Sequence, residues 1–425
     1  MGGVRIMKIT DPPNADFLSP GETSLCPAEE TRTPDHLTSV IIPTFNRADF
    51  LVECIAAIEQ QTMPVGEILI VDDGSTDQTV EVVRGFGQRV TLISQPNAGK
   101  AAALNSGIKH TRHPFVWIVD DDDIVLPDAL ENLAAPLIRD SEIGFSYGPH
   151  RRFSTHAQSG KKETLSTGYW TECEPDEFLI STLEDFFAHQ PGTLIRRSLL
   201  DKVGPFDETM LRSQDYEMLI RLAREGKCAV CEETVFEQRL HNRRRGPNED
   251  GFDASQSNRK WIEYDQRIFQ RLHVQMELCE YLPGKRSIAS LSDCRQALLQ
   301  RGTIMARKKL WDLAIDDFET ASKITDDALT PIEVQCLRRA LSSKYGCNEM
   351  FEAPEIAQRL GQLRAANPIG RAIVRSVASG LIWRIRRGLR NKTFDQAMKY
   401  AGAYLKLTVM PGYPTRLAAT KLSVN

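Results

Sequence analysis

The chain has 425 residues, 41% hydrophobic and 26% charged, which is typical of globular proteins and excludes a mostly disordered or collagen-like chain. Its formal net charge of −4 at pH 7 gives no electrostatic reason to expect nucleic acid as a partner. No apolar run approaches the roughly 20 residues that cross a bilayer, and the first residues lack a signal-peptide core. Nine scattered cysteines suit a reducing compartment. We therefore expect a soluble cytoplasmic protein of two or three domains.

The first 36 residues are rich in Pro, Thr, Asp and Glu without apolar periodicity, which predicts a disordered N-terminal tail. After residue 37, short apolar runs alternate with helical patterns. The runs at 39–43, 68–71, 90–93 and 115–119 are predicted strands, and 48–62 and 80–86 carry apolar residues at helical spacing. Uniformly apolar strands alternating with helices predict an α/β domain with a mainly parallel sheet covered on both faces.

Polar side chains gather where these strands end. Thr44, Asn46 and Arg47 follow the first strand, and Asp72 and Asp73 follow the second. Four consecutive aspartates, at 120–123, follow the fourth strand. Ligands of such sheets bind beyond the carboxyl ends of the strands. The pattern therefore predicts a ligand site at this edge.

The four aspartates predict a divalent-cation site. Adjacent carboxylates repel and raise one another's pKa unless a cation is present. Mg²⁺ and Mn²⁺ prefer such oxygen ligands and bind through one or two carboxylates plus substrate phosphates. The alternative is a solvated turn that caps a helix starting near Pro127.

Several motifs together resemble family 2 glycosyltransferases. They are SVIIPTFN (39–46), IVDDGSTD (70–77), NAG (97–99) with ALNSG (103–107), IVDDDDI (118–124), GTLIRR (192–197), VGPFD (203–207) and SQDYEM (213–218). The resemblance spans about 38–245. It implies a GT-A fold and sugar transfer from a nucleotide-sugar donor with inversion, aided by Mn²⁺ or Mg²⁺.

The resemblance also implies roles for individual residues. Those expected in the nucleotide-sugar site are Pro43, Thr44, Phe45, Asn46, Arg47, Asp72, Asp73, Lys100, Asp120 and Asp121, with Phe45 against the base, Asp73 on its edge and Asp72 supporting that loop. Asp122 is expected to bind the metal directly, with Asp120 and His241 as further candidates. The fourfold aspartate run leaves this register open by one position. For the arginines at 243–245 both a phosphate contact and a solvated basic loop remain open.

The resemblance places the catalytic base at Asp215. A positioned base that takes the acceptor proton contributes roughly 10² to 10⁴ in rate. Gln214 stands where the family more often has an acid, which removes a like-charged neighbour. The alternative for Asp215 is a helix N-cap before Met218, Leu219 and Leu222. The CAVC segment at 228–231 has the spacing of a metal or redox pair, but no second pair follows, and we interpret its cysteines as buried thiols.

The second half of the chain is predicted to be α-helical. We expect a glycosyltransferase domain at 37–248, a helical linker at 249–290 and a helical region at 291–425. Small residues at 291–325 suit two packed antiparallel helices, and a weaker version of this pattern at 392–407 leaves both a plain bundle and tetratricopeptide repeats open.

Residues 369–390 predict one basic amphipathic helix. Apolar residues recur every fourth position from Ile369 to Leu389, and arginines occupy much of the remainder. Such a helix binds an anionic membrane surface or a protein partner, or packs as an ordinary bundle helix. A membrane surface would make the protein peripheral at the inner face of the cell membrane.

Two functions from different classes follow. The first is a metal-dependent inverting glycosyltransferase that acts on a glycan or lipid-linked acceptor in bacterial surface polysaccharide synthesis. The second is a noncatalytic glycosyltransferase-like platform with a helical interaction module. Degenerate members normally lose the metal aspartates or the base, and both are present here, which favours the enzyme.

Overall fold

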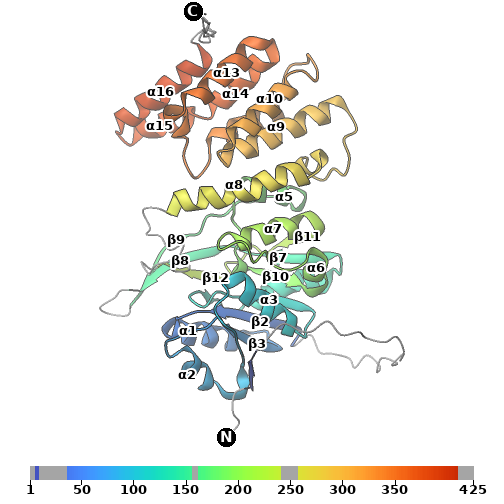
Figure 1. Ribbon diagram of the computed structural model, residues 1–425, viewed down its shortest axis with the longest axis vertical. Coiled ribbons are helices and arrows are strands. Elements are labelled where there is room, and N and C mark those ends of the chain that lie inside the picture. The colour runs from blue at the N-terminus through green and yellow to red at the C-terminus, as the bar shows by residue number, and fades with distance from the viewer. Residues whose placement is uncertain (1–4, 9–35, 156–160, 241–256, 410–425) are drawn as a thin grey trace, which may run out of the picture. The chain divides into compact units, whose positions relative to one another are not determined.

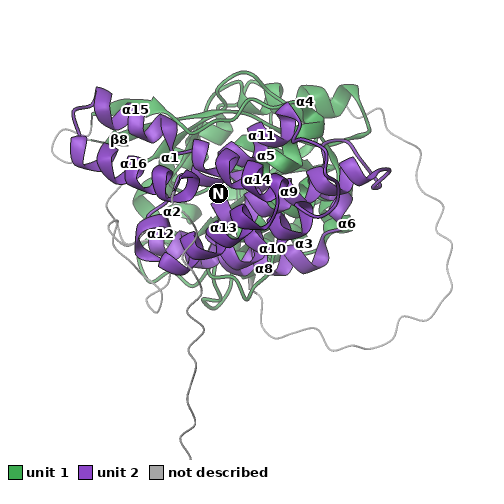
Figure 2. Cartoon of the chain, turned by 90° about the horizontal axis from the view of Figure 1, so that it is seen from above, with its two compact units in different colours: residues 1–182, 186–256 green, residues 183–185, 257–425 purple. Residues whose placement is uncertain are grey.

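The structure is a computed structural model that describes residues 5–8, 36–155, 161–240 and 257–409. The chain forms two compact units, shown in different colours in Figure 2. Unit 1 comprises residues 1–182 and 186–256, and unit 2 comprises residues 183–185 and 257–425. Each unit is described by itself below.

Unit 1 is built on an eight-stranded sheet in the order β1-β4-β3-β2-β5-β10-β7-β11 (Figure 1). Its strands are β1 (Arg5–Lys8), β2 (Thr38–Thr44), β3 (Glu67–Asp72), β4 (Thr91–Ser94), β5 (Phe115–Ile118), β7 (Ile143–Tyr147), β10 (Thr193–Arg196) and β11 (Lys227–Val230). Neighbouring strands pair in parallel except β10, which is antiparallel to both β5 and β7. The predicted mainly parallel sheet is confirmed.

Both faces of this sheet are buried, which explains its uniformly apolar strands. Successive side chains of a strand point to opposite faces, so Val40 and Ile42 join one core and Ile41 joins the other. The first core includes residues of α1 (Ala48–Glu59), α2 (Thr79–Arg84) and α4 (Ala129–Arg139). The second includes residues of α3 (Lys100–His110), α5 (Phe178–Glu184), α6 (Arg197–Val203) and α7 (Gln214–Glu225).

Strand β1 lies within the segment expected to be a disordered tail. Residues 5–8 pair in parallel with residues 91–94 of β4, so an edge strand of the sheet supplies the hydrogen bonds that this short segment cannot make alone. Residues 1–4 and 9–35 lie outside the described part of the chain.

A second, four-stranded sheet in unit 1 has the order β6-β12-β8-β9. Its strands are β6 (Ile124–Val125), β8 (His150–Thr155), β9 (Lys162–Thr167) and β12 (Phe236–Arg239). Strand β6 directly follows the four aspartates and pairs with β12. The second sheet therefore holds the aspartate segment from its C-terminal side.

The two cysteines of the CAVC segment are buried in unit 1. Cys228 lies in β11, Cys231 directly follows it, and both thiols are free. Burial raises the pKa of each thiol to about 12. Buried protonated thiols are unreactive, which agrees with their interpretation as structural side chains.

Unit 2 is α-helical. Its helices are α8 (Ser257–Gln275), α9 (Leu291–Arg307), α10 (Trp311–Ala321), α11 (Pro331–Arg338), α12 (Glu349–Glu352), α13 (Pro354–Ala366), α14 (Pro368–Ser379), α15 (Ile382–Arg390) and α16 (Phe394–Thr408). The predicted antiparallel pair at 291–325 is present as α9 and α10. A Cβ at Gly302 would approach the Phe318 ring within 2.6 Å, so this small residue permits the close packing. In the described part of the chain, no helix has an apolar stretch long enough to span a membrane.

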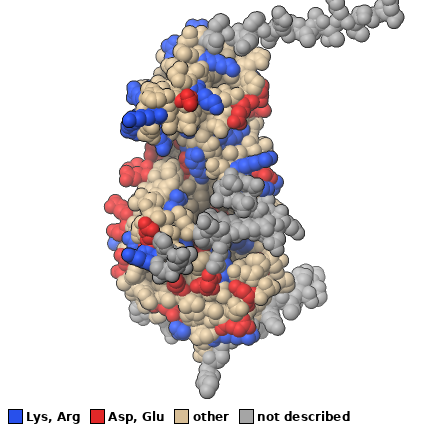
Figure 3. Space-filling model, turned by 90° about the vertical axis from the view of Figure 1, so that its left-hand side faces the viewer, with Lys and Arg blue, Asp and Glu red and all other residues tan. Residues whose placement is uncertain are grey.

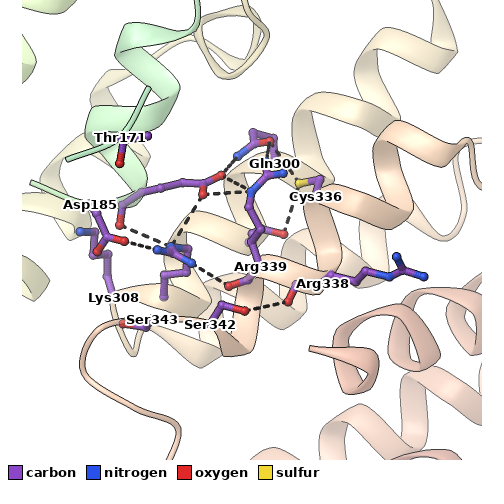
Figure 4. A network of polar contacts seen from close by, with 12 residues as sticks. Thr171, Asp185, Gln300, Lys308, Cys336, Arg338, Arg339, Ser342 and Ser343 are labelled. Atoms are coloured by element: carbon purple, nitrogen blue, oxygen red, sulfur yellow. Dashed lines mark hydrogen bonds and ion pairs between the residues drawn. The ribbon is translucent and has the colours of Figure 1, made fainter. Parts of the chain in front are cut away.

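A network of buried and partly buried charges stabilises unit 2, which includes residues 183–185 (Figure 4). Arg307 pairs with Asp185, and Arg339 Nε donates to both carboxylate oxygens of Glu184 at 2.8 and 3.0 Å. Gln300 Nε2 donates to Glu184 at 2.9 Å. Buried charges are tolerated when they are paired and hydrogen-bonded in this way.

The predicted single helix at 369–390 is wrong, because two helices occupy this segment. Helix α14 ends at Ser379, and α15 begins at Ile382. Gly380 lies where a Cβ would be 2.3 Å from the carbonyl oxygen of Arg338, so the chain breaks where its backbone approaches α11. Ile369, Ile373 and Val377 are all buried, which makes the apolar face of α14 part of the unit 2 core.

Candidate functional site

The polar residues predicted to form a site do lie together at one edge of the large sheet. Thr44 ends β2 and Asp72 ends β3, the two strands pair in parallel, and β5 runs beside β2 into the aspartate segment. Thr44 Oγ1 donates to Asp121 Oδ2 at 2.8 Å. Because parallel strands end at the same edge, residues 77 positions apart meet here.

Two cations neutralise the aspartate segment. Arg47, at the N-cap of α1, pairs with Asp121 at 3.2 Å and more closely with Asp122. Lys100, the first residue of α3, places Nζ 2.5 Å from Asp120 Oδ1. Three of the four aspartates are thus paired with one of these two cations.

Asp123 has a different role from the other three aspartates. Its Oδ1 accepts a hydrogen bond from the main-chain N–H of Arg239 in β12 at 3.0 Å. The Arg239 guanidinium donates to the Asp122 carbonyl oxygen at 3.0 Å and to Thr155 Oγ1 at 2.8 Å, and it pairs with Glu53 of α1. Asp123 is therefore a structural residue, which leaves 120–122 as the segment that can meet a ligand.

Arg239 is the residue that sequence reasoning missed. Its guanidinium carbon lies 4.8 Å from the Phe50 ring centre and 4.6 Å from that of Phe153, so α1 and β8 hold it between two aromatic faces. The available signal was the excess of negative charge at 120–123, which requires buried cations from elsewhere in the chain.

The interpretation of the aspartates as a solvated capping turn is wrong. Asp121 and Asp123 are 6% and 4% exposed, and the N-cap of α4 is Asp128. Burial raises the pKa of Asp121 to about 7 although Arg47 opposes the shift. Burial and the neighbouring carboxylates of Asp122 and Asp120 also raise the pKa of Asp123. Burial and mutual repulsion therefore disfavour the charged form of these carboxylates.

Asp72 and Asp73 both hold backbone in place. Asp72 Oδ1 accepts from the Ser75 N–H at 3.0 Å. The Asp73 carboxylate accepts from the N–H groups of Ala98 at 2.9 Å and Gly99 at 2.8 Å, and it is 5% exposed. Asp73 thus supports the loop that leads into Lys100, whereas the resemblance implies a place for it on the edge of the base.

The remaining predicted nucleotide residues border the same edge. Pro43 is buried in β2, whereas Phe45 directly after the strand is 43% exposed. Asn46 has a left-handed backbone, with φ of 55°, and its Oδ1 accepts from the Thr76 N–H at 2.7 Å. Backbone strain of this kind gathers at functional sites.

Asp215 lies in the first turn of α7, and the helix N-cap is Ser213. The interpretation of Asp215 as the N-cap is therefore wrong, although its Oδ1 accepts from the Tyr216 N–H at 2.9 Å. Ser213 has a left-handed backbone with φ of 56°. The chain turns at this strained residue and enters α7 at the next residue, Gln214.

Asp215 interacts electrostatically with the aspartate segment. Burial raises the pKa of its carboxyl, Lys100 opposes that shift, and Asp120 adds to it. Lys100 in turn has a raised pKa, because its attraction to Asp120 and Asp215 outweighs the cost of its burial. Lys100 thus links the predicted base to the predicted metal-binding segment.

A cavity of about 20 Å³ adjoins Asp215. Its lining is mostly apolar, with Asp215, Gln190 and Thr193 as the polar members and Ile118, Phe206 and Met218 among the others. A cavity of this volume holds about one water molecule. The apolar wall is the physical cause of the raised pKa of Asp215.

The carboxylates at 120–122 could hold a divalent cation. In the described residues, no three His, Cys, Asp or Glu side chains converge as a complete metal cage. Mg²⁺ and Mn²⁺ need no such cage, since one or two carboxylates suffice when substrate phosphates supply further oxygens. The donor set and its excess negative charge therefore fit such an ion. His241 and the arginines at 243–245 lie outside the described residues.

Residues 39–204 match the family model described as "Glycosyl transferase family 2", so this part of the chain is similar to that family. The chain is 28% identical over 224 residues to hyaluronan synthase of Pasteurella multocida, which covers 51% of this chain and 22% of that protein. The chain thus spans about a fifth of the length of this curated relative.

Two solved structures are also similar to this chain. One is S. aureus TarS 1–349 in complex with UDP-GlcNAc, with a TM-score of 0.49 and 17% identity, covering 86% of this chain and 91% of that one. The other is the mannosyltransferase of Pyrobaculum calidifontis in complex with GDP-Man and Mn²⁺, with a TM-score of 0.41 and 18% identity, covering 88% of each chain.

Proposed function

We propose that the chain is an inverting glycosyltransferase that moves a sugar from a nucleoside-diphosphate sugar to a hydroxyl group of a glycan or lipid-linked acceptor. The observation that carries the proposal is the position of Lys100. Its ammonium bonds to Asp120 at 2.5 Å and interacts electrostatically with Asp215. One site thus contains two carboxylates with different tasks. Asp120 is suited to hold donor phosphates through a cation, and Asp215 is suited to accept a proton.

The donor side of the site consists of the strand ends and the aspartate segment. Phe45 is exposed enough for its ring to stack on a nucleotide base. Asp122 and Asp120 would hold Mn²⁺ or Mg²⁺, with Arg47 and Lys100 neutralising their remaining charge. When bound, the cation neutralises charge that develops on the departing diphosphate.

The acceptor side of the site is Asp215. Its carboxylate would take the hydroxyl proton while the acceptor oxygen forms a bond to the anomeric carbon and the carbon–phosphate oxygen bond breaks. Attack from the face opposite the leaving group inverts that carbon. The raised pKa of Asp215 makes its carboxylate a stronger base than an exposed aspartate.

We extend the proposal to the synthesis of a bacterial surface polysaccharide on the cytoplasmic side of the membrane. The similarity to hyaluronan synthase, a protein named for a polysaccharide product, supports this extension. The sugar, the nucleotide and the acceptor depend on contacts that the sequence leaves open.

A screen of UDP-, GDP- and dTDP-sugars tests the proposal. The full chain is incubated with each donor and excess Mn²⁺, and released nucleoside diphosphate is measured. We expect release from at least one donor, and abolition of that release by a chelator. A chain that binds a nucleotide-sugar but releases no diphosphate from any donor, with a mixed glycan acceptor present, would instead be the noncatalytic platform.

A further inference from the structure

Helix α16 carries apolar side chains on two opposite faces. Ala397, Ala403 and Leu407 are buried. A second set lies exposed at spacings of four, seven and four residues, which places its members on one face of the helix. These are Phe394, Met398, Leu405 and Val409, with exposed fractions of 59%, 71%, 52% and 68%.

The partner helix of α16, α15, carries exposed basic side chains. Trp383 of α15 is 40% exposed, and Arg386, Arg387 and Arg390 are exposed. Lys392, at the turn between the two helices, is exposed as well. In the upper part of Figure 3, Lys and Arg side chains lie among uncharged surface, with a few Asp and Glu side chains between them.

The charge of this hairpin is opposite to that of the whole chain. Residues 382–409 contain four arginines and three lysines but only one acidic residue, Asp395, a net charge of +6. The whole chain has a formal net charge of −4. The basic charge is therefore concentrated on one helical hairpin.

The hairpin is a folded part of unit 2. A Cβ on Gly388 of α15 would lie 3.0 Å from the Cβ of Ala397, so the two helices pack closely. Arg384 donates to the carbonyl oxygens of Leu341 at 3.3 Å and Ser343 at 3.1 Å. Arg384 is thus a structural residue, whereas the arginines at 386, 387 and 390 are exposed.

We propose that the α15–α16 hairpin binds an anionic lipid surface, with the exposed face of α16 and Trp383 entering the interface and the arginines of α15 contacting lipid headgroups. Aromatic and long apolar side chains beside exposed cations are the features that bind a helix in the plane of a membrane interface. Each cation near an anionic leaflet strengthens binding by about fivefold. A bare apolar face would suit many partners, but a net charge of +6 selects a surface dense in negative charge.

The inference replaces the membrane surface expected at residues 369–390. The apolar residues of α14 belong to the unit 2 core and cannot also enter a membrane. The residues that the structure exposes lie mostly after 390, in α16. Lipid binding by the hairpin does not depend on the glycosyltransferase activity.

Sedimentation of the full chain with lipid vesicles tests the proposal. Vesicles of phosphatidylcholine alone are compared with vesicles containing about 30% phosphatidylglycerol, a fraction on the order of that in anionic leaflets, at low and high salt. We expect binding to the anionic vesicles only and release by salt. Arg386→Gln with Arg387→Gln should weaken binding about 25-fold, at about fivefold per charge.

The matched control is Arg371→Gln with Arg375→Gln, which removes two exposed arginines of α14 and should leave vesicle binding within about twofold. Phe394→Ser with Met398→Ser should weaken binding about tenfold or more through lost apolar burial. Unchanged thermal melting of each variant shows that folding is intact.

Three results would overturn the proposal. They are failure of the parent to bind anionic vesicles, equal loss of binding in the α14 control, and lipid-free dimerisation of the parent that Phe394→Ser with Met398→Ser abolishes. The last result would identify a second copy of the chain as the occupant of this face.

Discussion

The main-chain N–H of Arg239 donates to Asp123 Oδ1 at 3.0 Å, joining two residues that are 116 positions apart. The Arg239 guanidinium also donates to the carbonyl oxygen of Asp122. Strand β12 therefore holds the backbone of the aspartate segment, so that Asp120 and Asp122 face the strand-end site with fixed geometry. We regard Arg239 as a positioning residue, because it acts on a ligand only through this segment.

Arg239→Met should loosen the aspartate segment. Methionine retains apolar contact with the rings of Phe50 and Phe153 but cannot donate to Asp122, Thr155 or Glu53. We expect a loss of about 2 kcal/mol in the free energy of unfolding in urea, the range for hydrogen bonds to a charged group. Affinity for UDP with Mn²⁺, measured by calorimetry, should fall about tenfold, as it does when outer partners of a metal site are lost.

Arg152→Met is the matched control, since Arg152 lies on the adjacent strand β8 and donates from Nε to the Gln238 side chain at 3.3 Å. It should leave UDP affinity unchanged. If Arg239→Met lowers stability but binds UDP with Mn²⁺ like the parent, Arg239 does not position the aspartates.

Asp122→Asn should separate binding from stability. Removing one of four adjacent negative charges relieves repulsion but weakens the pair with Arg47, so the unfolding free energy should change by less than about 1 kcal/mol. The Mn²⁺-dependent part of UDP affinity should fall at least tenfold, since an amide oxygen is a weaker ligand for a hard cation than a carboxylate. Asp128→Asn, at an exposed position six residues later, should change neither. If the Asp122 variant binds UDP with Mn²⁺ as tightly as the parent, and a chelator weakens that binding as much as it does in the parent, Asp122 is not a ligand.

His150 should make unit 1 sensitive to acid. Burial, together with the charge of Arg152, lowers the pKa of His150 to about 4, and its ring stacks on Phe236 and packs edge-on against His189. An unfolded histidine has a pKa of about 6.5. Between these values the unfolded chain binds more protons, so the unfolding free energy should fall by about 2 kcal/mol from pH 7.5 to 5.

His150→Phe keeps the aromatic packing and removes the titrating group, so this pH dependence should shrink by the same amount in urea unfolding at the two pH values. His36→Gln, at an exposed histidine, should not change it. A pH dependence in His150→Phe that equals the parent's would show that other groups cause the acid sensitivity.

The pH dependence of transfer should reflect the environment of Asp215. A base acts only when ionised, and burial raises the pKa of Asp215. The rate should therefore fall with decreasing pH at values above those expected for an exposed aspartate. Lys100→Met should move this fall to still higher pH, because Lys100 lowers the pKa of Asp215. A fall that stays in place in Lys100→Met would argue against an electrostatic link between the two residues.

The sequence predicted the sheet and the edge of the site because local signals carried both. Apolar strands buried on both faces leave uninterrupted apolar runs, and the polar residues after them mark the strand ends. The division of roles within residues 120–123 could not be predicted in this way. It depends on β12, more than 100 residues later, which uses Asp123 for structure.

The C-terminal region shows the same limit. Apolar residues recur every fourth position from 369 to 389, but periodicity does not reveal that the backbone breaks where Gly380 meets the carbonyl of Arg338. Nor does it reveal which apolar face is buried. Both depend on the packing of α11 and α13 against α14, which lies beyond a local pattern.

The central claim is that Asp215 is the catalytic base. The measurement that tests it most directly is the transfer rate of Asp215→Asn at saturating donor, beside its affinity for UDP with Mn²⁺. Asparagine keeps the size of the side chain and can still accept the Tyr216 N–H bond, but it cannot take up a proton at neutral pH. Glu217→Gln, which neutralises another carboxylate in the same turn of α7, is the matched control.

We expect Asp215→Asn to lower the transfer rate by roughly 10² to 10⁴ while UDP affinity stays within about threefold, since the interaction is needed only in the transition state. The Glu217 variant should retain transfer within about threefold on the same grounds. Transfer by Asp215→Asn at a rate near that of the parent would contradict the account.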